Sequence, residues 1–275
     1  MDKVRQQLNK FKNCLDNYSI ASIRKARDNI DKKVVRDRCY HKLHEIDKKY
    51  FVCQSVNTFI DLCGGPGQFA KYIFDSNFEC RGYGVTLNNA LNYQFKNRNF
   101  TRIYGHDNSG NIFDTSVQFE LQMLCENNAV DLIVADGAVD VSGNENHQET
   151  INFLIISEEC KIILKLLKVN GNCVIKVFDT FNDETVCLLE NFATHFENSY
   201  IFKPSSSRAA NSERYLVCKN RLEVADKSKK INLNQIHFAK KQILALKKLL
   251  KHLNNGQLNA SRSAAARSNK FKRLQ

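Results

Sequence analysis

The sequence of 275 residues contains no tryptophan, only two prolines and no C-x-x-C pair among its ten cysteines. Unpaired cysteines argue against a zinc site and for reduced thiols. No apolar run approaches the 18 residues that a membrane span requires. The polar segment 1–7 lacks the apolar core of a signal peptide. We therefore expect an intracellular protein without a bound metal and without a membrane partner.

Charge is distributed unevenly along the chain, whose total is +12. Residues 1–50 carry a net charge of +7, residues 51–218 carry −8, and residues 219–275 carry +13. A mildly acidic body between two basic ends suggests a catalytic core flanked by segments that bind a polyanion such as nucleic acid. The alternative is that the basic ends are solvated tails that serve solubility.

Strand-like and helix-like segments alternate through the middle of the chain, which is typical of a parallel sheet with helices on both faces. The last two strand-like segments have no helix between them and should be antiparallel. The sequence therefore predicts an α/β, Rossmann-like fold with a mainly parallel seven-stranded sheet and a C-terminal antiparallel hairpin. The expected strands are 59–62, 80–87, 101–104, 130–135, 173–178, 200–203 and 214–218.

Helical extensions are expected at both ends of this fold. Residues 4–30 have helical periodicity, and an apolar stripe with spacings of three and four residues runs from Ile236 to Leu253. We expect the stripe to pack on the core domain, with a short coiled coil as the alternative. The predicted units are a basic helical extension (1–35), a catalytic domain (36–220), a basic amphipathic helix (221–256) and a disordered basic tail (257–275).

Two ionisable residues end apolar strands. Asp136 closes the segment 130–136, and Lys176 closes the segment 171–176. Ligands bind at the carboxyl ends of strands in open α/β sheets. The pair therefore indicates an active site that works by proton transfer. Taken singly, Asp136 could start a turn and Lys176 could be a solvated lysine at the end of a strand.

A glycine-rich loop, 61–67, follows the first strand and opens a helix. Its glycines allow a ligand to approach the backbone closely, and a helix N-terminus favours an anionic group. A dinucleotide site would need an acidic residue at the end of the second strand, and the segment 82–87 has none. NAD is therefore disfavoured, while a plain tight turn remains the alternative for the loop.

Several segments match the motifs of one family. Four of them are general: a K-L-x-E-I segment at 42–46, a glycine-rich loop at 59–69, a D-G segment at 135–138 and a strand that contains a lysine at 174–179. Three more, at 104–112, 140–149 and 203–215, are long and specific. On these segments the sequence resembles the FtsJ-like RNA ribose 2′-O-methyltransferases over about residues 36–220, and the three long segments are similar to those of the mRNA cap 2′-O-methyltransferases. Its compact size is similar to that of the enzymes encoded by large DNA viruses of insects.

The resemblance implies a catalytic tetrad of Lys42, Asp136, Lys176 and Glu213. It implies methyl transfer from S-adenosyl-L-methionine to the ribose 2′-oxygen of the first transcribed nucleotide of 5′-capped mRNA. We expect Lys176 to accept or orient the hydroxyl proton, with a pKa lowered by partial burial and by Lys42. Asp136 and Glu213 would hold the two amines in place. Singly, Lys42 could be an ordinary helix lysine, and Glu213 a charge that protects a sheet edge.

The resemblance also implies binding residues. The cofactor is expected to contact the loop glycines, with Asp61 anchoring the loop or the cofactor amine, Asp107 near adenine and Thr86 near the ribose. The complete cofactor set is Asp61, Gly64, Gly65, Pro66, Gly67, Thr86, Asp107 and Asp136. RNA phosphates are expected to meet a set of cationic side chains: Lys32, Lys33, Arg36, Arg38, Lys203 and Arg208.

Two other functions remain open at this point. One is a ribosomal or transfer RNA 2′-O-methyltransferase, and the other is a catalytically inactive subunit that binds RNA or the cap. The C-terminal basic helix could also contact other capping or transcription proteins. The expected location is the nucleus or cytoplasm, in an infected host cell if the protein is viral.

Overall fold

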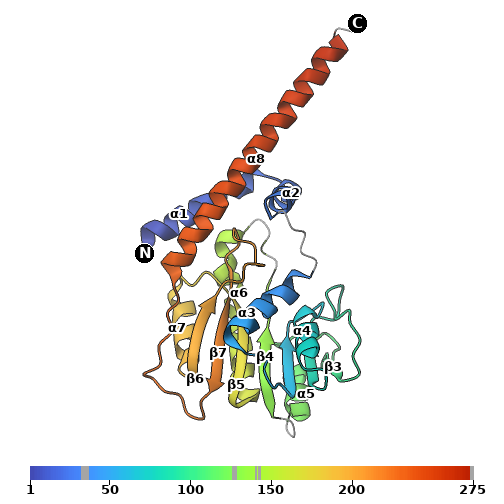
Figure 1. The fold of residues 1–275 in the computed structure, drawn as a ribbon, viewed down its shortest axis with the longest axis vertical. Coiled ribbons are helices and arrows are strands. Elements are labelled where there is room, and N and C mark those ends of the chain that lie inside the picture. Colours follow the sequence, from blue (N-terminus) through green and yellow to red (C-terminus); the bar gives the residue numbers. More distant parts are fainter. Residues whose placement is uncertain (32–36, 126–128, 140, 142–143, 273–275) are drawn as a thin grey trace.

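The computed structural model describes residues 1–31, 37–125, 129–139, 141 and 144–272, with the backbone alone for 256–272. Its body is a seven-stranded sheet with helices packed around it (Figure 1). The strands are β1 (Thr58–Leu62), β2 (Arg81–Val85), β3 (Phe100–Ile103), β4 (Val130–Ala135), β5 (Leu167–Phe178), β6 (Phe196–Phe202) and β7 (Glu213–Arg221).

The order of the strands is β3-β2-β1-β4-β5-β7-β6. The strands β1 to β5 pair in parallel, whereas β7 is antiparallel to both of its neighbours, β5 and β6. The predicted mainly parallel sheet with a C-terminal antiparallel hairpin is therefore confirmed. This arrangement collects the carboxyl ends of the parallel strands at one edge, where ligands bind in folds of this class.

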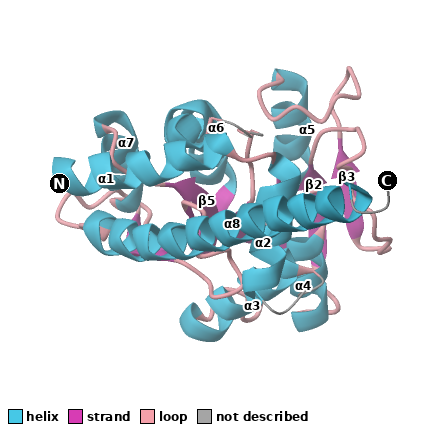
Figure 2. Cartoon of the chain, turned by 90° about the horizontal axis from the view of Figure 1, so that it is seen from above, coloured by secondary structure: helices cyan, strands magenta, loops and turns pink. Residues whose placement is uncertain are grey.

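Helices cover both faces of the sheet (Figure 2). On one face lie α3 (Arg38–Tyr50) and α4 (Gln68–Ser76), and on the other lie α5 (Thr115–Cys125), α6 (Gln148–Leu166) and α7 (Asp183–Ala193). The side chains of β4 alternate between these two cores. Leu132 and Val134 pack on the side of α3 and α4, while Ile133 and Ala135 pack on the opposite side. A strand buried on both faces is apolar throughout for this reason.

The N-terminal extension is two helices rather than the single helix expected over 4–30. The structure has α1 (Asp2–Asn13), a short 3₁₀ helix (Cys14–Asn17) and α2 (Ile20–Asp31). Tyr18 breaks the helix because its backbone is extended, with φ −125° and ψ 142°. The hydroxyl of Ser19 then accepts the N–H of Ser22 at 3.2 Å, which satisfies a free donor at the start of α2.

The last helix, α8 (Gln235–Lys272), packs mainly against α1 and α2. The expectation that its stripe covers the core domain is therefore wrong, because α1 and α2 present their own apolar side chains to it. The cluster contains Leu8, Leu15, Ile23, Ala26, Ala239, Ile243, Leu246, Leu249 and Leu253, and it contacts the body through Phe181 and Ala210. The backbone of α8 continues to Lys272, through the segment expected to be disordered, and the division into four units stays a prediction.

A buried ion pair ties this helical layer to the body. The amine of Lys12, on α1, lies 2.6 Å from Oδ2 of Asp179, which directly follows β5. Arg214, on β7, donates to the backbone oxygen of Asp179 at 3.0 Å. The layer of α1, α2 and α8 is thus held near the end of the sheet, as Figure 1 shows. Among the described helices, none combines the length and apolar character needed to cross a membrane.

The packing of α8 predicts a difference between two leucines of the same helix. Leu246 is fully buried, and Leu246→Ala should lower the free energy of unfolding by about 2–5 kcal/mol, because a cavity remains between α8, α1 and α2. Leu244 is 66% exposed, so Leu244→Ala should change it by less than about 0.5 kcal/mol. Denaturant unfolding measures both, and equal effects would contradict this packing.

Candidate active site

Two ion pairs lie at the carboxyl edge of the sheet. The amine of Lys176 is 3.2 Å from Oδ1 of Asp136 and also donates to the backbone oxygen of Asp136. The amine of Lys42 contacts both carboxylate oxygens of Glu213, at 2.8 and 3.0 Å. Both lysines are buried, with 8% exposure for Lys42 and 7% for Lys176. The four residues predicted from the sequence are therefore brought together.

Strand register explains how distant parts of the chain meet here. Ala135, directly before Asp136, pairs with Ile175, directly before Lys176, in neighbouring parallel strands. On the other side of β5, Phe178 pairs with Glu213, the first residue of the antiparallel strand β7. Lys42 then reaches Glu213 from α3, which packs over this face of the sheet. The site thus depends on one parallel and one antiparallel pairing of the same strand.

The charges in this cluster shift the pKa of the lysines upward. Burial lowers the pKa of Lys176, and Lys42 acts in the same direction, but Asp136 and Glu213 together outweigh them and raise it. The expectation of a lowered pKa for Lys176 is therefore wrong for the free protein. Lys42 also has a raised pKa, because Glu213 and Asp136 outweigh its burial.

Glu213 shows the reverse effect. Burial raises the pKa of its carboxyl, yet Lys42 and Lys176 overcome burial and lower the pKa to about 2. Its Oε1 also accepts the hydroxyl of Ser207 at 2.8 Å. Glu213 is accordingly a carboxylate at neutral pH, and the cluster contains two ammonium groups and two acidic partners.

Two further residues of the site were not singled out from the sequence. The hydroxyl of Tyr215 donates to Oδ1 of Asp136 at 2.9 Å, and Ser207 orients Glu213 as described above. A sequence signal existed for Tyr215, because residues two apart on a strand share a face and Tyr215 lies two residues after Glu213. Ser207 belongs to the loop 203–212, whose conformation no periodicity indicates.

Glu159, on α6, is a third residue that the sequence analysis missed. It is fully buried, and its Oε1 accepts the N–H of Gly137, the residue after Asp136, at 3.1 Å. Burial, its largest influence, raises the pKa of Glu159 to about 8, although Lys176 and the Gly137 N–H act against this. Glu159 follows Glu158 directly in α6, and nothing in the sequence distinguishes the buried glutamate from its partly exposed neighbour.

The glycine-rich loop packs against Asp61, on β1. Asp61 is completely buried, and within the described residues neither of its carboxylate oxygens has a hydrogen-bond partner. A Cβ atom at Gly64 would lie 2.1 Å from that carboxylate, so only glycine fits there. Gly67 has φ 102°, a conformation that favours glycine, and directly precedes α4. The loop therefore brings a polar group and a helix N-terminus to one place.

Two other predicted cofactor residues have contacts of a structural kind. The hydroxyl of Thr86, which follows β2, accepts the N–H of Gly65 at 3.3 Å and so supports the loop. Asp107 is exposed and follows β3, and its Oδ1 accepts the N–H of Ser109 at 3.0 Å. This hydrogen bond lowers the pKa of the Asp107 carboxyl. An aspartate side chain that accepts the backbone N–H two residues later commonly stabilises a turn in this way.

The predicted RNA-contacting residues are placed differently from one another. The amine of Lys203 donates to the backbone oxygens of Asn211 and Glu213, at 2.7 and 2.8 Å, and burial lowers its pKa to about 8. Lys203 thus braces the loop before β7 instead of facing solvent. Arg208 pairs with Asp28 of α2 at 3.2 Å, and Arg38 begins α3 one turn before Lys42. Lys32, Lys33 and Arg36 lie outside the described residues.

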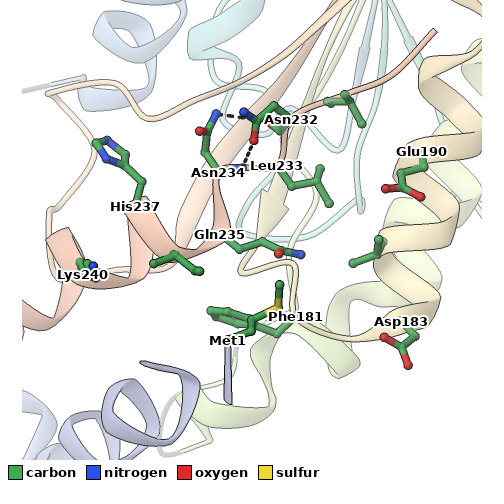
Figure 3. Close-up of a pocket in the computed structure, with 13 residues that line it drawn as sticks. Met1, Phe181, Asp183, Glu190, Asn232, Leu233, Asn234, Gln235, His237 and Lys240 are labelled. Atoms are coloured by element: carbon green, nitrogen blue, oxygen red, sulfur yellow. Dashed lines mark hydrogen bonds between the residues drawn. The ribbon is translucent and has the colours of Figure 1, made fainter. Parts of the chain in front are cut away.

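The pocket with the largest volume among those described is not at the two ion pairs. A pocket of about 900 Å³ lies between α7 and the start of α8, and Figure 3 shows Asp183 and Glu190 on one side of it and Leu233 and Lys240 on the other. None of its thirteen lining residues belongs to the two ion pairs. A smaller pocket of about 150 Å³ is lined by Ser212 among others, and Ser212 directly precedes Glu213 in the sequence.

The raised pKa of Glu159 predicts how the stability of the protein varies with pH. An acid with a pKa raised from 4.5 to about 8 stabilises the fold below pH 4.5 and loses that contribution as the pH rises to 8. Glu159→Gln keeps an acceptor for Gly137 without the titration. In denaturant unfolding, wild type should become progressively less stable than Glu159→Gln between pH 5 and 8. Parallel pH profiles would contradict a titrating Glu159.

Comparisons with known proteins bear on this site. The family model of FtsJ-like methyltransferases matches residues 35–221. The chain is 47% identical over 258 residues to a cap-specific mRNA (nucleoside-2′-O-)-methyltransferase of Autographa californica nuclear polyhedrosis virus, covering 91% of this chain and 98% of that protein. It is 33% identical to cap-specific mRNA (nucleoside-2′-O-)-methyltransferase 1 of Trypanosoma brucei brucei, covering 75% of this chain and 64% of that protein.

A third relative carries a different description. It is the inactive cap-specific mRNA (nucleoside-2′-O-)-methyltransferase 1B of Caenorhabditis briggsae, which is 32% identical over 61% of this chain and 21% of its own length. The family match spans more than half of the chain, including both ion pairs and the glycine-rich loop. The resemblance expected from the sequence is thus confirmed at the level of the family. The chain belongs to the FtsJ-like methyltransferase family.

Proposed function

We propose that this protein transfers a methyl group from S-adenosyl-L-methionine to the ribose 2′-oxygen of the first transcribed nucleotide of 5′-capped mRNA. The observation that carries the proposal is the pair of buried ion pairs, Lys176–Asp136 and Lys42–Glu213, at the ligand-binding edge of the sheet. The viral relative, aligned over 98% of its length, supports capped mRNA as the substrate. Such a protein would act inside cells, where transcripts are made and processed.

The residues around the glycine-rich loop fit S-adenosyl-L-methionine. The unpartnered carboxylate of Asp61 suits the ammonium group of the methionine end. The start of α4, after Gly67, suits its carboxylate. Gly64, Gly65 and Pro66 would line this part of the site, and Asp107 and Thr86 would lie on the adenosine side. When bound, the cofactor supplies a methyl group on a positively charged sulfur, so the acceptor oxygen needs to lose a proton.

Lys176 would bind the ribose 2′-hydroxyl and take its proton as the oxygen bonds to the methyl carbon and the carbon–sulfur bond breaks. Asp136 and the hydroxyl of Tyr215 would hold the amine in position, while Lys42 and Glu213 would complete the charge balance. Because the pKa of Lys176 is raised in the free protein, its amine begins as an ammonium group. Lys176 would therefore have to release one proton to solvent before it accepts the hydroxyl proton, and this release is part of the energetic cost of the reaction. Alignment of the reactants would lower the barrier further.

The role of Lys176 can be tested by removing its amine. Lys176→Ala should lower methyl transfer to a short capped RNA by at least about 10²–10⁴-fold, the usual effect of a positioned base. Calorimetric titration should show that S-adenosyl-L-methionine still binds, since Lys176 lies outside the glycine-rich loop. Lys161→Ala, which removes a lysine with a 69% exposed side chain, is the matched control and should leave the rate unchanged. Undiminished transfer by Lys176→Ala would refute the assignment.

The cofactor loop gives an independent prediction. Gly64→Ala would push a methyl group into the carboxylate of Asp61, so we expect the affinity for S-adenosyl-L-methionine to fall by about tenfold or more. The thermal midpoint of the variant without ligand shows whether the fold is retained. A folded Gly64→Ala protein with wild-type affinity would show that the cofactor binds elsewhere.

Two rival functions make different predictions for the same assay. A ribosomal or transfer RNA methyltransferase would methylate uncapped RNA as well as capped RNA. An inactive cap- or RNA-binding subunit, a role consistent with the description of the Caenorhabditis briggsae relative, would bind RNA in a salt-sensitive manner without transferring a methyl group. The intact pairs of lysine and carboxylate favour the active enzyme over this second rival.

A further inference from the structure

One face of α8 concentrates positive charge without compensation. We define the lysine face as five exposed side chains: Lys240, Lys241, Lys247, Lys248 and Lys251. The segment 235–255 contains no aspartate or glutamate. Solvated helices commonly mix both signs, because opposite charges three or four residues apart stabilise each other. Within the described part of the chain, none of the five lysines forms an ion pair with a carboxylate.

Helical geometry turns most of the lysine face away from the packing interface. Each residue advances about 100° around a helix of 3.6 residues per turn, so Lys241 and Lys248 lie roughly opposite the buried side of α8. The other three lysines lie on one flank, where the amine of Lys247 is 5.3 Å from the centre of the Phe11 ring on α1. The buried side, which includes Ala239, Ile243 and Leu246, packs against α1 and α2. The lysine face is therefore open to a partner, and it extends about 17 Å from Lys240 to Lys251 at 1.5 Å per residue. That length suits several successive charges of an extended polyanion.

The position of α8 relates the lysine face to the active site. Contacts that join the layer of α1, α2 and α8 to the region of the candidate active site include Lys12 with Asp179 and Asp28 with Arg208. Asp179 lies three residues after Lys176, and Arg208 belongs to the loop that leads to Glu213. An RNA that enters the active site could therefore continue along this layer.

We propose that the lysine face binds the phosphate backbone of the transcript downstream of the methylated nucleotide. This inference rests on the proposed function, because it takes capped RNA as the substrate. The charge balance favours RNA as the occupant, since residues 51–218, which hold most of the catalytic site, carry −8, whereas 219–275 carry +13. Contacts of this kind depend on charge and not on base sequence.

The expected effect of the lysine face is on the KM for long RNA. In the test, all five of its lysines are replaced by glutamine. The KM for a capped RNA of about 30 nucleotides should rise about tenfold or more, and kcat should stay the same. Each lost phosphate contact should also reduce the slope of log affinity against log salt by about 0.7. A capped RNA of about three nucleotides has few phosphates downstream of the methylated nucleotide and should keep its KM.

A second variant with the same loss of charge elsewhere serves as the control. It replaces five other exposed lysines by glutamine and should leave both KM values unchanged: Lys96, Lys161, Lys165, Lys227 and Lys230. An unchanged KM and salt slope for the long RNA in the lysine-face variant would overturn the proposal and leave the surface to an acidic protein partner. An equal loss for the short RNA would overturn it too.

The proposed function and this inference fail in different ways. If wild-type protein does not methylate the short capped RNA, the proposed function fails. The inference is then still tested by the binding of fluorescent 30-nucleotide RNA, measured as anisotropy. Weaker binding by the lysine-face variant alone supports it, and equal binding by both variants overturns it.

Discussion

The pairing of β7 with β5 is the constraint on which the candidate active site depends. It is antiparallel in an otherwise parallel part of the sheet, and it sets Glu213 opposite Phe178, two residues from Lys176. A parallel neighbour would have brought its carboxyl end to this edge, whereas β7 brings its first residue there. As a result the short loop between β6 and β7 lies over the active site. Ser207 and Lys203 of this connection then brace Glu213 by a hydroxyl contact and a backbone contact.

Burial of two lysines beside two partly buried carboxylates is costly unless every partner is present. The structure meets this requirement by surrounding the carboxylates with donors: Lys42 and Ser207 for Glu213, and Lys176 and Tyr215 for Asp136. The same neighbours that make burial tolerable also raise the pKa of Lys176. If Lys176 is the base, as proposed, the interactions that stabilise the free site also oppose deprotonation of its amine, and substrate binding would have to shift that balance.

The sheet and two of the four central residues could be predicted from local patterns, whereas Lys42 and Glu213 were named only through the resemblance to a family. Asp136 and Lys176 end apolar strands, and the antiparallel hairpin follows from two strands without a helix between them. Glu159 could not be predicted, since its partner Gly137 is distant in the chain and its neighbour Glu158 has the same side chain. The inward orientation of Lys203 could not be predicted either. A lysine in a loop is expected to face solvent or a phosphate, and only the structure shows that its amine donates to two backbone oxygens. The apolar stripe of α8 was predicted from the spacing of its residues. That spacing does not show which part of the protein packs against the stripe, and in the structure α1 and α2 do so.

The most direct test of the central claim is to remove the acceptor atom. Capped RNAs would carry a 2′-deoxyribose at the first nucleotide, at the second nucleotide or at neither, and transfer of a labelled methyl group to each would be measured. The account predicts that transfer is lost only when the first nucleotide lacks its 2′-hydroxyl. Transfer that persists without that hydroxyl would contradict the proposed reaction.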